Sequence, residues 1–433
     1  MKHGIAKFLT ASLLTLALAA PALAEPAPLD IGEAIRLTLE NNAELRSLRQ
    51  ETIKARAFKL QADGTLLPSV TAGGYLDKQR EDQTTAGDRD DNRVARASIE
   101  QTIYSGGKNS ALRRQSPIKK TIAELMIANG ENSVTGELYA RFYNVLLQRG
   151  NIAAEEAAVK TSELHLKQVR RMSELGLANR LEVIRAGQQL AANTANLASA
   201  RGQYEAAHLS LMNYMAIPPQ DKRPVTGELY LPDADGDRAA SLALAERFRA
   251  DRRQLAEQYK FQTEQVEIAK SGMRPKVAFG ATTSYLDPYQ KRDEGGDTWR
   301  AELSITVPIF DRNVARSSVM TEKAVLEQNR IAAEQKEIDI RSEVETSWTA
   351  IETTRRTVAA NEKALELAKE SLRLSEVGYS EGVTPQLDLL DAQAALTAAQ
   401  LEYLRARYNH LVAIVALKMT EGTIAEWSGG KRQ

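Results

Sequence analysis

The sequence contains no cysteine and only four histidines among its 433 residues, and His3 lies in the N-terminal segment. Without cysteine the chain has no disulfide and no site for lipidation on an N-terminal cysteine. The remaining histidines (His165, His208 and His410) are scattered, which argues against a transition-metal centre, and no cofactor is expected. Aromatic residues make up only 5% of the chain, which suits long helices better than a thick globular core.

Catalytic motifs and an excess of one charge are also missing. The 57 basic and 57 acidic residues balance, so nothing indicates a nucleic-acid partner. Neither G-x-S-x-G nor H-E-x-x-H occurs. The segment SGGKNS (105–110) resembles a P-loop, but Thr102 stands where the first glycine belongs and Asn109 where a hydroxyl should bind magnesium. We interpret Gly106 and Gly107 as the exit from a strand into a helix and expect no enzymatic activity.

The N-terminal segment is typical of a secretory signal peptide. Lys2 and Lys7 precede an apolar run over 8–20, and Ala22-Leu23-Ala24 fits a cleavage site, so 1–24 is the predicted signal. The alternative is a retained membrane anchor. Beyond this segment no run of eighteen apolar residues occurs. An exported chain of this kind is periplasmic, secreted or an outer-membrane β-barrel.

Similar segments recur along the chain at an offset of about 206 residues. IEQTIYSGGKNSA (99–111) resembles ITVPIFDRNVARS (305–317), and LEVIRAGQQLA (181–191) resembles LDLLDAQAALT (387–397). Apolar residues at four- and seven-residue spacing repeat at the same offset: Val134, Leu138, Val145, Ile152, Val159 and Leu166 against Ile340, Val344, Ile351, Val358, Leu365 and Leu372. We interpret the chain as two copies of one unit.

The predicted organisation is a signal peptide (1–24), a first repeat (25–216), a Pro- and Gly-containing connector (217–239), a second repeat (240–420) and a C-terminal tail (421–433). Each repeat is predicted to hold a helix, two strands, a very long helix and a shorter helix, at about 30–63, 67–77, 93–104, 108–175 and 182–215, and again at about 240–271, 275–287, 298–310, 312–377 and 385–420. The fold class is therefore mainly α with a small β part. Each long helix would reach roughly 100 Å, and its heptad spacing favours a coiled coil that assembles with other helices.

The predicted strands alternate apolar and polar residues. In TWRAELSITVPIF (298–310), one face carries Trp299, Ala301, Leu303, Ile305, Val307 and Ile309, and the other Arg300, Glu302, Ser304 and Thr306. This alternation fits a membrane barrel with a wet lumen, and also a half-buried sheet of a soluble protein. The signal peptide and the polar loops at 78–92 and 289–297 favour the membrane, with Tyr285, Tyr289 and Trp299 in an interfacial belt. Four strands cannot close a barrel, so several chains would have to share it.

In architecture and motifs the chain resembles the TolC-like outer-membrane efflux proteins over essentially its whole mature length. The segments that carry the resemblance are LDIGEAIRLTLENNAELRSLRQE (29–51), LLPSV, MRPKV, QTIYSGG, VPIFDRN and GYSEGVTPQLDLLDAQAAL (378–396). The resemblance implies a homotrimer with a 12-stranded β-barrel in the outer membrane, continued by a long α-helical barrel across the periplasm. It also implies an exit duct powered by its partners, a periplasmic adaptor and an inner-membrane pump of the RND, MFS or ABC type.

Two carboxylates stand near the start of the last predicted helix, where Thr384 is the expected N-cap and Pro385 the first helical residue. Asp388 and Asp391 share one face of that helix. They compensate the helix dipole, or, as the resemblance implies, they ring the periplasmic aperture, where three chains would bring six carboxylates together as a cation-binding constriction. No metal site in the strict sense is predicted.

The resemblance also implies bonds that hold the aperture shut. Tyr379 matches a gate tyrosine, and Glu182 stands where its acidic partner is expected. The gate arginine of the family falls at Thr384, so that link is missing, and Arg180 is the candidate replacement. The alternative is that Tyr379 and Glu182 are surface residues of two turns.

The two turns at the ends of the helical hairpins are the predicted contact with the adaptor, at Gly176 and Leu177 and at Gly378 and Gly382. An alternative from another class is a periplasmic coiled-coil scaffold that does not conduct. The cargo and the particular pump are not encoded in any motif, because small-molecule efflux and protein secretion use the same duct.

Overall fold

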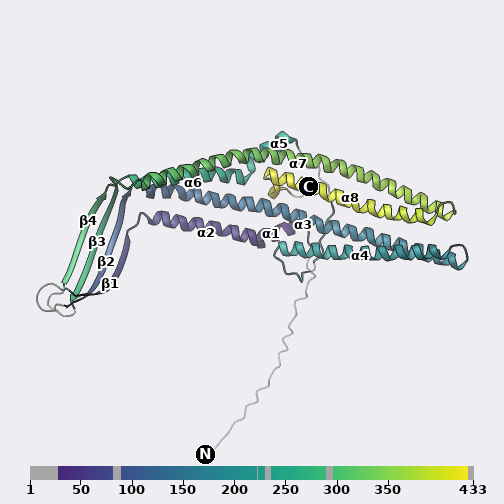
Figure 1. Cartoon of the computed structure of the whole chain (residues 1–433), viewed down its shortest axis with the longest axis horizontal. Coiled ribbons are helices and arrows are strands. Elements are labelled where there is room, and N and C mark those ends of the chain that lie inside the picture. Colours follow the sequence, from purple (N-terminus) through teal and green to yellow (C-terminus); the bar gives the residue numbers. More distant parts are fainter. Residues whose placement is uncertain (1–27, 81–88, 222, 230–235, 289–295, 428–433) are drawn as a thin grey trace, which may run out of the picture.

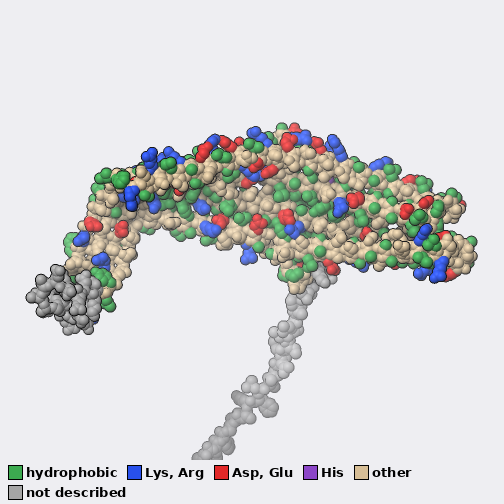
Figure 2. Space-filling model, in the orientation of Figure 1, with side chains coloured by type: hydrophobic (Ala, Val, Ile, Leu, Met, Phe, Trp, Pro, Cys, Tyr) green, Lys and Arg blue, Asp and Glu red, His purple; other side chains and the backbone are tan. Residues whose placement is uncertain are grey.

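The computed structural model describes residues 28–80, 89–221, 223–229, 236–288 and 296–427. The predicted signal peptide at 1–24 lies outside the described residues. The described chain forms an elongated body of helices with one sheet at its end, and the tips of two helical hairpins lie at the opposite end (Figure 1). Acidic and basic side chains are interspersed along the helical body (Figure 2).

Helices and strands follow the same order in the two halves of the chain. The first half holds α1 (Ile31–Asn41), α2 (Ala43–Gly64), β1 (Ser69–Arg80), β2 (Arg89–Ser105), α3 (Lys108–Glu174) and α4 (Arg180–Tyr214). The second holds α5 (Arg238–Phe248), α6 (Ala250–Lys270), the 3-10 turn η1 (Ser271–Met273), β3 (Lys276–Pro288), β4 (Gly296–Thr306), α7 (Val314–Ser380), α8 (Gln386–Glu421) and η2 (Ile424–Glu426). The two very long helices and the mainly helical fold class are confirmed.

The first helix of each half is broken in two, and the prediction of continuous helices over 30–63 and 240–271 was wrong. Asn42 ends α1 and caps α2, because its side-chain oxygen accepts hydrogen bonds from the backbone N–H groups of Glu44 and Leu45. Its amide also donates to Tyr214 O at 3.0 Å. Arg249 occupies the corresponding break between α5 and α6 with extended backbone.

The four strands form one antiparallel sheet in the order β1-β2-β3-β4. The chain leaves β2 for α3 at Gly106 and Gly107, whose φ angles are 67° and 93°. A Cβ at Gly106 would lie 2.6 Å from Ser271 O, so this exit has no room for a side chain. The interpretation of these glycines as a strand-to-helix exit is confirmed.

The register brings the apolar residues of neighbouring strands onto one face. Val277 pairs with Ile305, and Phe279 pairs with Leu303. The opposite face carries polar and charged side chains, including Arg300, which pairs with Thr282. Every residue of β4 is exposed, and Trp299 is 82% exposed. The predicted separation of apolar and polar residues onto opposite faces of the sheet is therefore confirmed for β4. Nothing within the described chain covers its apolar face.

The last strand is shorter than predicted, because β4 ends at Thr306 and not near 310. Pro308 has no backbone N–H to donate to a neighbouring strand, which explains the early end. Val307 and Ile309 consequently lie beyond the strand. Tyr289, predicted in an aromatic belt, lies outside the described residues.

The hydrophobic core lies midway along the helical body, where α3, α4 and α8 meet α1 and the connector. Tyr139 and Phe142 of α3 are fully buried there. Leu29 joins Val225 of the connector through a parallel β-bridge, and Tyr139 donates a hydrogen bond to Trp427 O at 2.7 Å. The core therefore ties Leu29, Trp427 and the connector to the long helix. None of the helices in the described part of the chain is both long and apolar enough to cross a bilayer.

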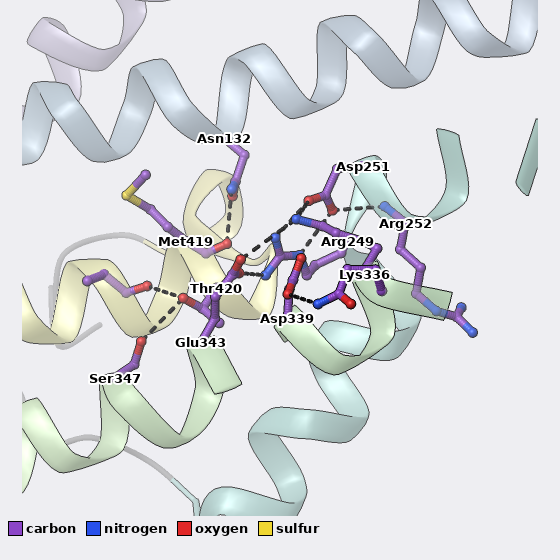
Figure 3. A network of polar contacts seen from close by, with 12 residues as sticks. Asn132, Arg249, Asp251, Arg252, Lys336, Asp339, Glu343, Ser347, Met419 and Thr420 are labelled. Atoms are coloured by element: carbon purple, nitrogen blue, oxygen red, sulfur yellow. Dashed lines mark hydrogen bonds and ion pairs between the residues drawn. The ribbon is translucent and has the colours of Figure 1, made fainter. Parts of the chain in front are cut away.

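A charged network joins the break between α5 and α6 to α7 (Figure 3). Arg249 is only 11% exposed; its guanidinium lies 2.7 Å from Asp251 and also bonds Glu343. Lys336 reaches Asp251 at 2.8 Å. Burial alone would raise the pKa of Asp251, but the bonds from Arg249 and Lys336 outweigh it and hold that pKa well below the usual range. The network fixes the short helices against the long one.

Candidate functional site

The two helical hairpins end in turns of the same type. At the end of α3, Gly176 has a φ of 72°, and the N–H of Leu177 donates back to a carbonyl of the last helical turn at 2.8 Å. At the end of α7, Gly382 has a φ of 74°, and the N–H of Val383 does the same at 2.8 Å. This is the helix ending that glycine makes possible in the left-handed region. Leu177 and Val383 are 71% and 81% exposed, so each tip presents an apolar side chain.

Gly378 has a different role from the other tip glycines. Its carbonyl accepts hydrogen bonds from the N–H groups of Val383 (2.8 Å) and Thr384 (3.0 Å). A Cβ at Gly378 would lie 2.1 Å from Thr384 Oγ1, so any larger residue at this position would force the Thr384 side chain to move.

Helix α8 begins one residue later than predicted, and the assignment of Thr384 as its N-cap was wrong. Pro385 is the capping residue, with extended backbone and no capping side chain. The N–H of Thr384 donates to Gly378 O in the turn that precedes α8. In the other hairpin Asn179 caps α4 in the usual way and accepts from the N–H of Glu182 at 3.0 Å.

Asp388 and Asp391 both lie on the exposed side of α8, whereas Leu389, Leu390 and Ala392 are buried against the rest of the chain. Asp388 stands in the first helical turn, where a carboxylate is favourable to the helix dipole. Both carboxylates are therefore available to a neighbouring chain, to solvent or to cations. In the described part of the chain, no group of three or more His, Cys, Asp or Glu residues is arranged to hold a metal ion.

The gate candidates lie close to one another but are not bonded as the resemblance implies. The hydroxyl of Tyr379 is buried and has no hydrogen-bond partner among the described residues. Burial, together with the nearby Glu182 carboxylate, raises the pKa of Tyr379. The Glu182 side chain accepts from Asn179 Nδ2 at 2.9 Å, and Arg180 is exposed. The roles of Tyr379, Glu182 and Arg180 in a gate stay predictions.

Two residues that the sequence did not single out join the hairpins at this place. Gln386 of α8 and His165 of α3 are each only 6% exposed. Gln386 Nε2 donates to His165 Nε2 at 3.2 Å and to the backbone carbonyl of Glu182 at 3.0 Å. The His165 ring meets the Tyr379 ring edge to face at 5.6 Å between centroids. This group of four residues, one from each of α3, α4, α7 and α8, is called the tip cluster below.

No local motif reveals the tip cluster, because its central bond joins residues 221 positions apart. The one sequence feature that could have indicated the cluster is His165, which stands beside the apolar face of α3. Leu166 and Val169 of that face are buried. A polar side chain in such a position has to find a partner, and the partner comes from the other hairpin.

The model of the outer membrane efflux protein family matches the chain twice, over residues 34–216 and 241–423. The chain belongs to the outer membrane efflux protein family. The family that matches is one of outer membrane efflux proteins, which are not enzymes. The two matches cover both halves, each with its helices, its pair of strands and its hairpin tip.

Relatives and solved structures agree with this membership. The chain is 25% identical over 299 residues to outer membrane efflux protein BepC of Brucella suis, covering 68% of this chain and 64% of that protein. It is 24% identical over 402 residues to outer membrane protein TolC of Escherichia coli, covering 89% and 80%. The CmeC outer membrane channel of Campylobacter jejuni superposes with a TM-score of 0.80 at 16% identity over 91% of this chain and 85% of that one, which shows a shared fold.

Proposed function

We propose that the protein is the outer-membrane exit channel of a tripartite efflux or type I secretion system, and that it passively conducts substrates across the periplasm and the outer membrane. The observation that carries this proposal is the sheet. Its apolar residues share one face, β4 is fully exposed, and among the described residues no further strand pairs with the outer edges of β1 and β4. An apolar sheet face of this kind finds its partner in lipid, and unpaired edges in lipid have to be closed by other strands.

Three chains would supply the closure. About eight strands is the practical minimum for a barrel, and three copies of the four-stranded sheet give twelve. Trp299 and Tyr285 would then lie in the lipid-facing layer. The 67 residues of α3, and the same number in α7, would reach roughly 100 Å from the membrane. The homotrimer would thus be located in the outer membrane and extend through the periplasm.

The tips would form the periplasmic end of the duct. Asp388 and Asp391 face away from their own chain, and a threefold axis would gather six carboxylates from three copies. A ring of this kind attracts cations and narrows the passage. Compensation of the helix dipole by Asp388 is compatible with this role, because the two effects act on different partners. Tyr379 and Glu182, with Arg180 nearby, are proposed to contribute to the closed state of this aperture.

The adaptor contact is proposed at the exposed apolar side chains of the tips. Leu177 and Leu181 of the first tip correspond to Val383 and Leu387 of the second, and all four are exposed. A patch of this kind, with Gly176, Gly378 and Gly382 fixing its turns, suits docking of a periplasmic adaptor that links the channel to an RND, MFS or ABC pump. The scaffold alternative leaves the apolar face of the sheet without a partner and is not favoured.

Single-channel recording separates the channel from the scaffold. Full-length protein extracted from outer-membrane fractions and reconstituted in planar bilayers is expected to give discrete conductance steps with a preference for cations. Recovery of the protein in the soluble periplasmic fraction, or correctly folded protein that gives no conductance, would contradict the proposal.

A further inference from the structure

In the tip cluster a buried titratable side chain bonds across from one hairpin to the other. His165 belongs to the α3–α4 hairpin, and Gln386 belongs to the α7–α8 hairpin. Gln386 Nε2 bonds both His165 Nε2 and the carbonyl of Glu182, so a single amide group holds two helices of the opposite hairpin. Gln386 Oε1 is buried without a partner among the described residues.

The geometry fixes the protonation state of the imidazole. The carbonyl of Glu182 accepts only, so the atom of Gln386 that faces it is the amino nitrogen, which donates only. The same nitrogen faces His165 Nε2, which therefore has to accept, and the imidazole is neutral with its proton on Nδ1. Burial favours the same state, because it lowers the pKa of His165.

A proton on His165 removes this arrangement. It places an N–H on Nε2 opposite the amino group of Gln386, so that two donors face each other. Rotation of the amide by 180° would offer Oε1 to the imidazolium, but it would also bring that oxygen against the carbonyl of Glu182. Either way one of the two bonds across the hairpins is lost.

We propose that the Gln386–His165 hydrogen bond is a latch that holds the two hairpins together at the closed tip, and that protonation of His165 releases it. The proposal rests on the proposed channel function and names a residue pair and a proton that regulate its aperture. The other groups around the ring are Tyr379 from α7 and Glu182 from α4; α8 contributes the uncharged Gln386. Tyr379 stays neutral across the physiological range, because its pKa is raised.

The direction of the pH effect follows from linkage. In the closed tip the pKa of His165 lies below its ordinary value, so the closed state binds fewer protons than a state in which the ring is hydrated. The closed state is therefore fully favoured above about pH 6.5 and loses its advantage as the pH falls below that value. For each chain, the ratio of open to closed tips rises up to about tenfold per pH unit below about 6.5, until the lowered pKa is reached.

The distance between the two hairpin tips tests the latch, and it can be measured whether or not the protein conducts ions. Leu177→Cys and Val383→Cys place one spin label on each tip of the cysteine-free chain, at exposed positions. Labelled chains are diluted with unlabelled chains so that each assembly carries one labelled pair. The distribution of distances between the two spin labels is then measured by double electron–electron resonance at pH 7.5 and 5.5. We expect a single short distance at pH 7.5 and a population at longer distance at pH 5.5.

Two substitutions of the same residue separate the hydrogen bond from the packing. His165→Gln keeps an acceptor that does not titrate, and it should give the short distance at both pH values. His165→Leu removes the acceptor, and it should give the longer population at both. His410→Gln is the matched control, because His410 is equally buried but lies within the α7–α8 hairpin, and it should keep the wild-type pH response.

The outcomes distinguish the latch from the channel. Conductance that rises on acidification, together with widening of the tips, supports both. Widening without conductance in any variant supports the latch and overturns the channel. Conductance with distances that do not respond to pH, or His165→Leu and His165→Gln variants that behave alike, overturns the latch and leaves the channel intact.

Discussion

Replacing Asp388 and Asp391 together by alanine tests whether these carboxylates act on permeating ions or only on their own helix. The change should leave folding intact. Loss of the favourable dipole interaction of Asp388 costs about 0.3–1 kcal/mol, and alanine, the best helix former, offsets part of it. Both side chains are exposed, so the substitution opens no cavity.

The effect on ions should be at least as large for a monovalent cation and about twice as large for a divalent one. Six unit charges at about 8 Å from a cation, in water with a Debye length of about 8 Å, attract it by about 1 kcal/mol. This corresponds to about fivefold enrichment of a monovalent cation and about thirtyfold of a divalent one. Removal of the ring should therefore abolish most of the cation selectivity and of the block by divalent cations.

The assay is the reversal potential and the divalent block of single channels in planar bilayers. The matched control replaces Glu376 and Glu381, two exposed acidic residues of the same hairpin, by alanine, so that the net charge changes equally. The control should keep the wild-type selectivity and block. Unchanged selectivity in a well-assembled Asp388/Asp391 double variant, or an equal loss in the control, would return both aspartates to a purely local role.

The remaining predictions concern stability and docking. Arg249→Ala should lower the free energy of unfolding by about 2–3 kcal/mol, below the 3–5 kcal/mol typical of a broken buried pair because Lys336 still faces Asp251. Since the pKa of Asp251 is lowered in the folded state, its ionised carboxylate should contribute fully to the free energy of unfolding above about pH 4, and this contribution should be lost as the pH falls further. Urea unfolding of wild type and variant at a series of pH values from 7 to 3 would measure it. Cysteines at Leu177 or Val383 should cross-link to the periplasmic adaptor in cells, whereas cysteines within 80–90 should not; the opposite pattern would reverse the orientation.

The sequence predicts the elements whose periodicity is strong and local. The two 67-residue helices keep an apolar spacing over many turns, and the alternation in β4 survives in the register of the sheet. The glycine turn at 106–107 was also predictable, because few other residues adopt that backbone.

The features that the sequence does not reveal depend on contacts between distant segments or on a single polar side chain. The break at Asn42 depends on one side chain that caps a new helix, inside a pattern that reads as continuous. Thr384 looks like a cap, but α8 begins one residue later and Pro385 occupies the capping position. The pairing of Gln386 with His165 exists only because the two hairpins lie side by side, and no spacing along the chain encodes it.

The mass of the detergent-extracted assembly tests the central claim most directly, because a four-stranded sheet with open edges cannot close alone. Native mass spectrometry of the full-length protein, with circular dichroism on the same sample to follow β-structure, is expected to show three chains. A stable monomer that retains its β-structure would contradict the shared barrel, and with it the channel.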